Sequence, residues 1–149
     1  MNHRTIALDA ALAVAACNGV AGLFGLLQWY RAQASRAFWL LARFGQALAI
    51  AYAALAGILY LSHDKPSSSL FYLYALLPIA IGFVAEQMRV LAADNVLTSR
   101  DILDAQAVGQ LPPDSQREIV LAILRREMVV MALAAVTVCF LALRAWGTY

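Results

Sequence analysis

Charged and amide side chains interrupt two of the apolar segments in this sequence. The stretch FVAEQMRVLAADN, residues 83–95, ends an apolar run with Glu86 and Arg89, which are three residues apart and would share one face of a helix. An earlier apolar segment carries Arg43 and Gln46, again three residues apart. A carboxylate, two guanidinium groups and an amide can form a structural ion pair, bind a polar or anionic molecule, or carry a proton.

The composition indicates that a membrane surrounds these groups. The chain has 149 residues, of which 63% are hydrophobic and 13% are charged, and its mean hydropathy is +0.71. Soluble domains are about half apolar and a quarter charged. The net charge is only +2 and no basic run is interleaved with aromatic residues, so we expect no nucleic-acid partner. The prediction is an integral membrane protein of a single domain.

Four segments are long and apolar enough to cross a bilayer, which requires roughly 20 residues of helix. The expected fold is therefore an all-α integral membrane protein, built as a four-transmembrane-helix bundle. Short connections join the first three spans, so we expect these to pack as antiparallel neighbours. The spans cover about residues 6–30, 37–62, 70–91 and 128–146.

The connection between the third and fourth spans, about residues 92–127, is longer and predicts a helical arm. A short helix is expected over 100–108, after which Gly109 and the double proline at 112–113 break the chain. The sequence SQRE at 115–118 matches a capping box, which predicts the start of a further helix. That helix would have about 30 residues, continue into the fourth span and project from the membrane by about two or three turns.

The distribution of basic residues predicts the orientation, because cytoplasmic segments are enriched in Lys and Arg. The 31–36 connection and the 92–127 arm carry most of these residues, whereas the chain ends and the 63–69 connection carry few. We therefore expect a cytoplasmic arm and two extracytoplasmic termini. The composition is rich in Ala and Arg and poor in Lys, so the expected location is a bacterial plasma (inner) membrane.

Small residues predict where the helices pack, because lipid supplies no hydrophobic force between them. Asn18, Gly22 and Gly25 lie along one stripe of the first span, with the alternating spacing of a helix–helix contact. The second span presents Gly45 among alanines at similar spacing. We expect these two faces to meet, with Asn18 hydrogen-bonded across the contact.

The intramembrane polar residues lie at similar depth, near the end of the bundle that carries the arm. Arg43 would lie about 9 Å inside its span at 1.5 Å per residue, where an unpaired charge is costly. We predict an Arg43–Glu86 ion pair with Gln46 completing its hydrogen bonds. Arg89 and Glu127 are candidates for a second pair. The candidate binding cluster comprises Arg43, Gln46, Glu86, Arg89, Arg126 and Glu127.

Three functions fit this pattern. The leading hypothesis is a non-enzymatic subunit or interaction partner of a membrane assembly, as a homo-oligomer or with another membrane subunit. It is favoured because the sequence shows no nucleophile, metal-binding set or cofactor motif, and Cys17 and Cys139 do not form a CxxC pair. The first alternative is a protein or enzyme that binds a small molecule or lipid in a cytoplasm-facing polar pocket between the helices. The second is a homo-oligomeric transporter or channel.

Overall fold

The computed structural model describes residues 3–62, 66, 68–102 and 105–149, which form helices and connecting turns. Four of these helices are long and apolar enough to span a membrane: α1, α2, α3 and α5. The predicted all-helical fold with four candidate spans is therefore confirmed. In chain order the helices are α1 (His3–Tyr30), α2 (Arg36–Leu61), α3 (Leu70–Thr98), α4 (Ala105–Gly109) and α5 (Pro113–Thr148).

Local sequence explains where two of the helices begin. Ser35 caps α2, because its Oγ accepts a hydrogen bond from the backbone N–H of Phe38 at 3.3 Å. α5 begins at Pro113, since the first turn of a helix does not need the N–H that proline lacks. The helix thus starts ahead of the predicted capping box at 115–118 and reaches 36 residues.

The arm differs from the prediction in two respects. α3 continues to Thr98, beyond the expected end of the third span at residue 91, because no glycine or proline interrupts it there. The prediction of a helix over 100–108 is largely wrong, because the helix observed here, α4, begins only at Ala105. The chain turns at Asp101, whose φ of 56° lies in the left-handed region. A residue with this φ cannot continue a right-handed helix. Residues 103–104 of that range lie outside the described residues.

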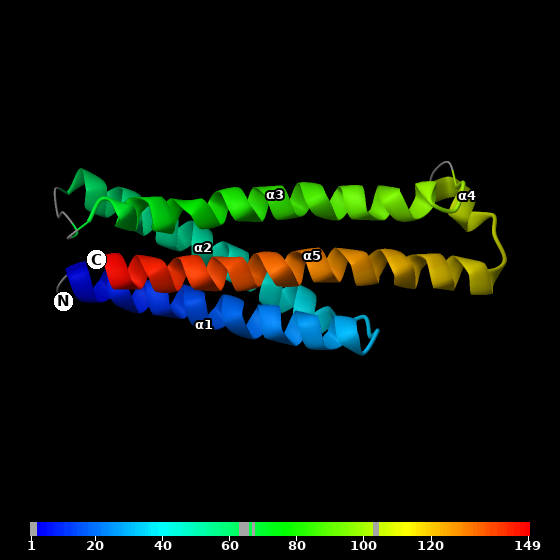
Figure 1. Ribbon diagram of the computed structural model, residues 1–149, viewed down its shortest axis with the longest axis horizontal. Coiled ribbons are helices and arrows are strands. Elements are labelled where there is room, and N and C mark those ends of the chain that lie inside the picture. Colours follow the sequence, from blue (N-terminus) through cyan, green and yellow to red (C-terminus); the bar gives the residue numbers. More distant parts are fainter. Residues whose placement is uncertain (1–2, 63–65, 67, 103–104) are drawn as a thin grey trace.

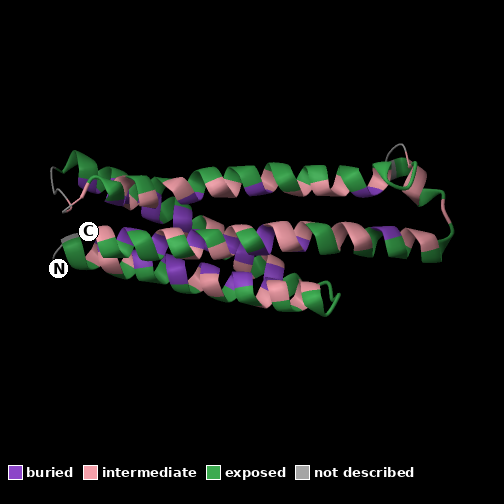
Figure 2. Cartoon of the chain, viewed as in Figure 1, coloured by how far each residue is buried: buried purple, intermediate pink, exposed green. Residues whose placement is uncertain are grey.

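The four long helices alternate in direction, and both ends of the chain lie at the same end of the bundle (Figure 1). α5 returns between α1 and α3 and packs along both. The arm, residues 92–127, joins the ends of α3 and α5 through α4 and extends past α1 and α2 at the opposite end of the bundle (Figure 1). Buried residues follow the contacts between helices, whereas the outward faces are largely exposed (Figure 2).

Glycines bring α1 close to its neighbours. A Cβ placed on Gly22 would lie 2.6 Å from Val136 Cγ2 and 3.1 Å from the Ala132 carbonyl oxygen, both on α5. A Cβ placed on Gly25 would lie 2.8 Å from the Phe38 ring atom Cδ2 on α2 and 2.9 Å from Ala132 Cβ. The first span therefore packs against the fourth span as well as the second, and the predicted stripe is divided between two partners.

Asn18 joins α1 to α2, as the sequence predicts. Its Nδ2 donates to the carbonyl oxygen of Val14 at 2.9 Å and to that of Gly45 at 3.3 Å. The side chain fits because Gly45 has none: a Cβ there would lie 2.8 Å from Asn18 Oδ1. The expected contact between the two small-residue faces is thus present at Asn18 and Gly45. At Gly22 the prediction is wrong, because this glycine lies against α5.

Candidate functional site

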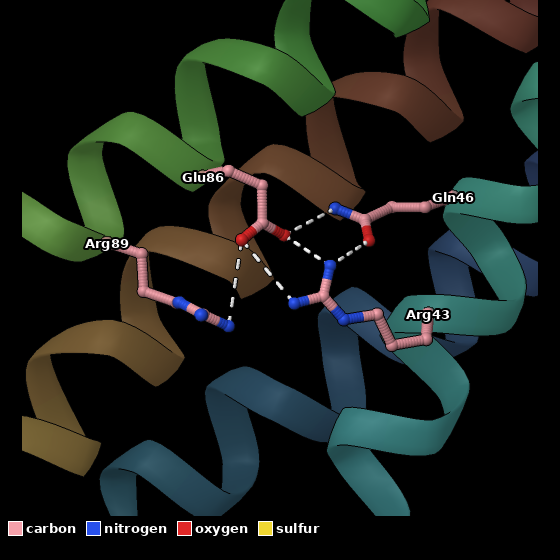
Figure 3. Close-up of polar contacts among 4 residues, drawn as sticks. All are labelled: Arg43, Gln46, Glu86 and Arg89. Atoms are coloured by element: carbon pink, nitrogen blue, oxygen red, sulfur yellow. Dashed lines mark hydrogen bonds and ion pairs between the residues drawn. The ribbon is translucent and has the colours of Figure 1, made fainter.

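Four polar side chains meet between α2 and α3 (Figure 3). Arg43 donates from Nη1 to Glu86 Oε1 at 2.6 Å and from Nη2 to Glu86 Oε2 at 3.4 Å. Gln46 Nε2 donates to the same Glu86 Oε1 at 3.1 Å, and Gln46 Oε1 accepts from Arg43 Nη1 at 2.9 Å. The predicted Arg43–Glu86 pair, completed by Gln46, is therefore present in the structure.

Arg89 approaches the same carboxylate, with its guanidinium group beside that of Arg43 (Figure 3). Its Nη1 lies 3.6 Å from Glu86 Oε2, and its guanidinium carbon lies 5.4 Å from the centre of the Trp39 ring. Its Nε is buried and has no hydrogen-bond partner among the described residues. Arg89 and Glu127 form no ion pair among the described residues, because Arg89 is directed toward Glu86, one turn away on its own helix. Glu127 still lies near enough to Arg89 to interact with it electrostatically.

Arg126 and Glu127 do not join this cluster. Arg126 is exposed and Glu127 is half-buried, and neither forms an ion pair within the part of the chain that the structure describes. We therefore define the polar cluster as Arg43, Gln46, Glu86 and Arg89. It contains two guanidinium groups and one carboxylate, so it carries one positive charge in excess.

A cavity of about 290 Å³ lies beside the polar cluster, between all four long helices. This volume lies just below the usual range for small-molecule pockets, about 300–1,000 Å³. Its polar lining comes from Asn18, Gln46 and Glu86. The remaining lining is apolar and includes Ala49, Ile50, Pro78, Ile79, Gly82, Phe83, Met131 and Val138.

Contacts between large side chains join α2 and α3 on both sides of this cavity. Toward the chain ends, the aromatic pairs Tyr52–Phe71 and Tyr60–Tyr72 have ring centroids 6.3 and 5.4 Å apart. On the other side, the polar cluster joins the two helices. Between these contacts Gly82 contributes no side chain, and a Cβ placed there would meet nothing within 4 Å. The cavity therefore follows from the spacing of the contacts and from the missing side chain.

Asn18 presents a polar atom to this cavity in addition to its packing role. Its Nδ2 is occupied by two carbonyl oxygens, whereas no donor among the described residues reaches its Oδ1. Sequence reasoning assigned Asn18 to packing, and the polar pocket that it considered did not include this residue. The signal that it left unused is the placement of Pro78 and Gly82 four residues apart on one face of α3. Proline frees a backbone carbonyl in the preceding turn, and glycine contributes no side chain.

A second, smaller cavity of about 190 Å³ lies where α1 ends against α5. Gln28 lines it, and the Oε1 of this side chain is buried without a hydrogen-bond partner from any described residue. Arg125 also lines it, with its guanidinium carbon 5.5 Å from the centre of the Trp29 ring. The sequence places Gln28 and Arg125 at this depth but does not predict a cavity between them.

Comparison of the chain with protein-family models, with curated proteins and with solved structures finds no match. Among the described residues, no group of three or more His, Cys, Asp or Glu side chains could hold a metal ion. The fold and the site therefore define the class of protein by themselves. The four candidate spans indicate a multi-pass, all-helical membrane protein, with a cavity between its helices and a charged cluster at the cavity's edge.

Proposed function

We propose that this protein binds an amphiphilic molecule in the cavity between the four long helices and does not convert it chemically. The observation that carries the proposal is the cavity, which combines apolar walls with three polar residues, Asn18, Gln46 and Glu86. An amphiphile has the same division between an apolar chain and a polar head. Spaces between the helices of a bundle are common ligand sites.

The chemistry of the cavity supports binding rather than catalysis or conduction. Both oxygens of Glu86 already accept hydrogen bonds, from Arg43 and Gln46, so this carboxylate is not free to act as a base. The residues found to line the cavity include no serine, threonine, cysteine or histidine that could attack a substrate. They include no second carboxylate that could pass a proton onward. Proton transport is therefore less favoured than ligand binding.

A membrane location and orientation belong to the same proposal. We place the chain in a bacterial plasma (inner) membrane, with the arm in the cytoplasm and both termini outside. The arrangement of positive charge supports this orientation. Arg31 and Arg36 connect α1 to α2, and the end of α3 and the start of α5 add Arg89, Arg100, Arg117, Arg125 and Arg126.

The orientation is tested by labelling single cysteines in a Cys17→Ala, Cys139→Ala background. Thr98→Cys introduces a thiol at an exposed arm position, and Ser62→Cys introduces one at an exposed position after α2. A membrane-impermeant maleimide added to intact cells should label the Ser62→Cys variant and leave the Thr98→Cys variant unlabelled until the cells are opened. The reverse pattern would contradict the orientation.

The binding proposal is tested by filling the cavity. Gly82→Leu introduces a side chain into open space within the cavity, because a Cβ at Gly82 meets nothing within 4 Å. Gly57→Leu is the matched control: its Cβ also meets nothing within 4 Å, but Gly57 does not line this cavity. Both proteins are extracted mildly from membranes, and native mass spectrometry measures any small molecule that stays bound.

The Gly82→Leu and Gly57→Leu variants should differ in the retention of a bound small molecule. The wild-type protein and the Gly57→Leu variant should each retain a small molecule, and the Gly82→Leu variant should lose it while remaining folded. Equal retention by both variants would place the molecule elsewhere on the protein. A wild-type protein that carries no small molecule under mild extraction would overturn the proposal.

A second function, as a subunit or interaction partner of a membrane assembly, is favoured by a different observation. Ile119 and Val96 are buried in the arm, and Arg100 is joined to Glu118 at 2.9 Å, so α3 covers part of the apolar face of α5. Other apolar residues of α3 and α5 near or within the arm stay 43–62% exposed: Met88, Val90, Leu91, Val120 and Leu121. An apolar surface of this kind marks an interaction site when it lies outside the bilayer.

The same mass measurement distinguishes this function from the first. A second polypeptide, or a second copy of this chain, at fixed stoichiometry would support the assembly hypothesis. The combined substitution Leu91→Ser, Val120→Ser should then release that partner. Leu23→Ser is the control, because Leu23 is 69% exposed on α1, away from the arm. A bare monomer in mild detergent would contradict a stable assembly.

A further inference from the structure

We propose that the occupant of the cavity is an acidic phospholipid of the surrounding bilayer, with one acyl chain in the cavity and its phosphate at the Arg43 and Arg89 guanidinium groups. This inference rests on the proposed binding function and adds the chemical class of the ligand. Three properties of the structure support it: the charge of the polar cluster, the unused donors of its arginines, and the size and opening of the cavity.

The charge of the polar cluster favours an anion. Arg43 and Arg89 both pair with the carboxylate of Glu86, and among the described residues no second carboxylate lies within ion-pair distance of either guanidinium group. Glu127 acts on Arg89 only from beyond that distance, so one positive charge of the cluster has no direct counter-ion. An uncompensated charge at membrane depth is costly, and a phosphate diester carries the one negative charge that would balance it. A zwitterionic or cationic headgroup would not supply that balance.

The arginines also keep donors that a phosphate can use. Arg89 Nε–H is buried and has no hydrogen-bond partner in the part of the chain that the structure describes, and buried polar groups are normally bonded. The Arg43 side chain is 51% exposed, so the part of its guanidinium group that does not contact Glu86 can be reached from outside the protein. Two arginines beside one another are well suited to phosphate oxygens, because each guanidinium offers several N–H donors in a plane.

The size and position of the cavity point to one acyl chain that enters from the lipid. A cavity of about 290 Å³ is too small for a whole phospholipid, whose second chain would remain in the bilayer. Its lining includes Ile50 on α2 and Ile79 and Phe83 on α3, which are 44–66% exposed on the outer faces of these helices. The occupant therefore reaches the cavity laterally, and phospholipids are the most concentrated amphiphiles on that side.

The inference is tested in lipid nanodiscs that contain phosphatidylglycerol and phosphatidylcholine in equal amounts. The protein is released from the nanodisc in the mass spectrometer, and the lipids that remain bound are identified. The wild-type protein should retain phosphatidylglycerol over phosphatidylcholine by about fivefold, the factor expected from one additional attraction between an arginine and an anionic headgroup. Oleate added to a parallel sample tests whether a free fatty acid is retained instead.

Variants of the two arginines test whether the polar cluster causes the preference for phosphatidylglycerol. Arg89→Gln should reduce the ratio to about one, and Arg89→Lys, which keeps the positive charge, should preserve most of it. Arg36→Gln is the matched control, since Arg36 is an exposed arginine at the same end of α2 and does not line the cavity. If Arg89→Gln does not fold, Arg43→Gln provides the second measurement, with the same expected loss.

The outcomes separate this inference from the function on which it rests. Phosphatidylcholine or oleate retained as well as phosphatidylglycerol, and lost in the Gly82→Leu variant, would overturn the acidic phospholipid and leave amphiphile binding intact. Phosphatidylglycerol selectivity that persists in both Arg89→Gln and Arg43→Gln would also overturn it. Lipid retention that is identical in wild-type protein and in Gly82→Leu would overturn both proposals.

Discussion

The contact between α1 and α5 and the contact between α2 and α3 are built in different ways. α1 meets α5 through small residues, with Gly22 lying against the α5 backbone and Ala132 fully buried opposite it. α2 meets α3 through large aromatic rings on one side and the Arg43–Glu86 pair on the other, and the cavity lies between these contacts. Small residues bring two helix backbones together, whereas long side chains hold two helices apart.

The largest effect of a single substitution is expected where α1 and α5 are closest. Gly22→Ala places a Cβ 2.6 Å from Val136 Cγ2 and 3.0 Å from the backbone nitrogen of Val136, so the helices must separate. Inserting an atom into a well-packed contact typically costs about 1–3 kcal/mol. We expect the free energy of unfolding to fall by that amount, measured by denaturant titration in detergent micelles.

Gly82→Ala is the matched control, because Gly82 lies beside the cavity between the contacts that join α2 and α3. A Cβ at Gly82 meets nothing within 4 Å, and alanine favours a helix over glycine by about 1 kcal/mol. The free energy of unfolding should therefore stay unchanged or rise slightly. A loss of stability as large as that of Gly22→Ala would show that α3 is packed as closely at Gly82 as α1 is packed against α5 at Gly22.

A smaller loss is expected when the polar side of the α2–α3 contact is broken. Glu86→Gln removes the negative charge between Arg43 and Arg89 and leaves two like charges near one another. Because these side chains are only partly buried, we expect a loss of about 1–2 kcal/mol, between the values for exposed and enclosed pairs. The double variant Glu86→Gln, Arg43→Met should lose less than Glu86→Gln alone, since one of the two uncompensated charges is gone.

The same unfolding titration gives the result for both variants. A double variant that loses more than Glu86→Gln alone would mean that Arg43 stabilises the fold through contacts other than its pair with Glu86. No loss in either variant would mean that the polar cluster does not hold α2 and α3 together, so the cavity would not depend on it.

The smallest loss is expected at Asn18. Asn18→Ala removes one hydrogen bond from α1 to the Gly45 carbonyl oxygen, and such bonds between membrane helices are worth about 0.6 kcal/mol on average. The unfolding titration should therefore show a decrease of that size, with Cys17→Ala as a neighbouring control on α1. A decrease as large as that of Gly22→Ala would show that the α1–α2 contact depends on Asn18 more than on its close packing.

The number of spans and the Arg43–Glu86 pair could be predicted from the sequence. Long apolar segments identify the spans. Two opposite charges at the same depth are expected to pair, because an unpaired charge within the membrane is costly. The position of α5 between α1 and α3 could not be predicted, because short connections identify neighbours only for consecutive helices and the long arm leaves the fourth span free. For that reason Gly22 was assigned to the wrong partner.

Two further features depend on distances between helices, which the sequence does not give. Arg89 had two candidate partners, Glu86 on its own helix and Glu127 on another, and the fixed distance of one helical turn favours Glu86. The cavity depends on how far the aromatic pairs and the polar cluster hold α2 from α3, and on the missing side chain at Gly82. The distance from Arg89 to Glu127 and the distance between α2 and α3 cannot be read from residue spacing along one helix.

The most direct test of lipid binding in the cavity is a structure of the protein determined in a lipid nanodisc, at a resolution that shows bound lipid. We expect elongated density in the cavity beside Gly82, continuing to a headgroup at Arg43 and Arg89. Lipid binding at this site would be contradicted if α2 and α3 close together so that no cavity remains, or if the cavity is present in the bilayer and contains no lipid density.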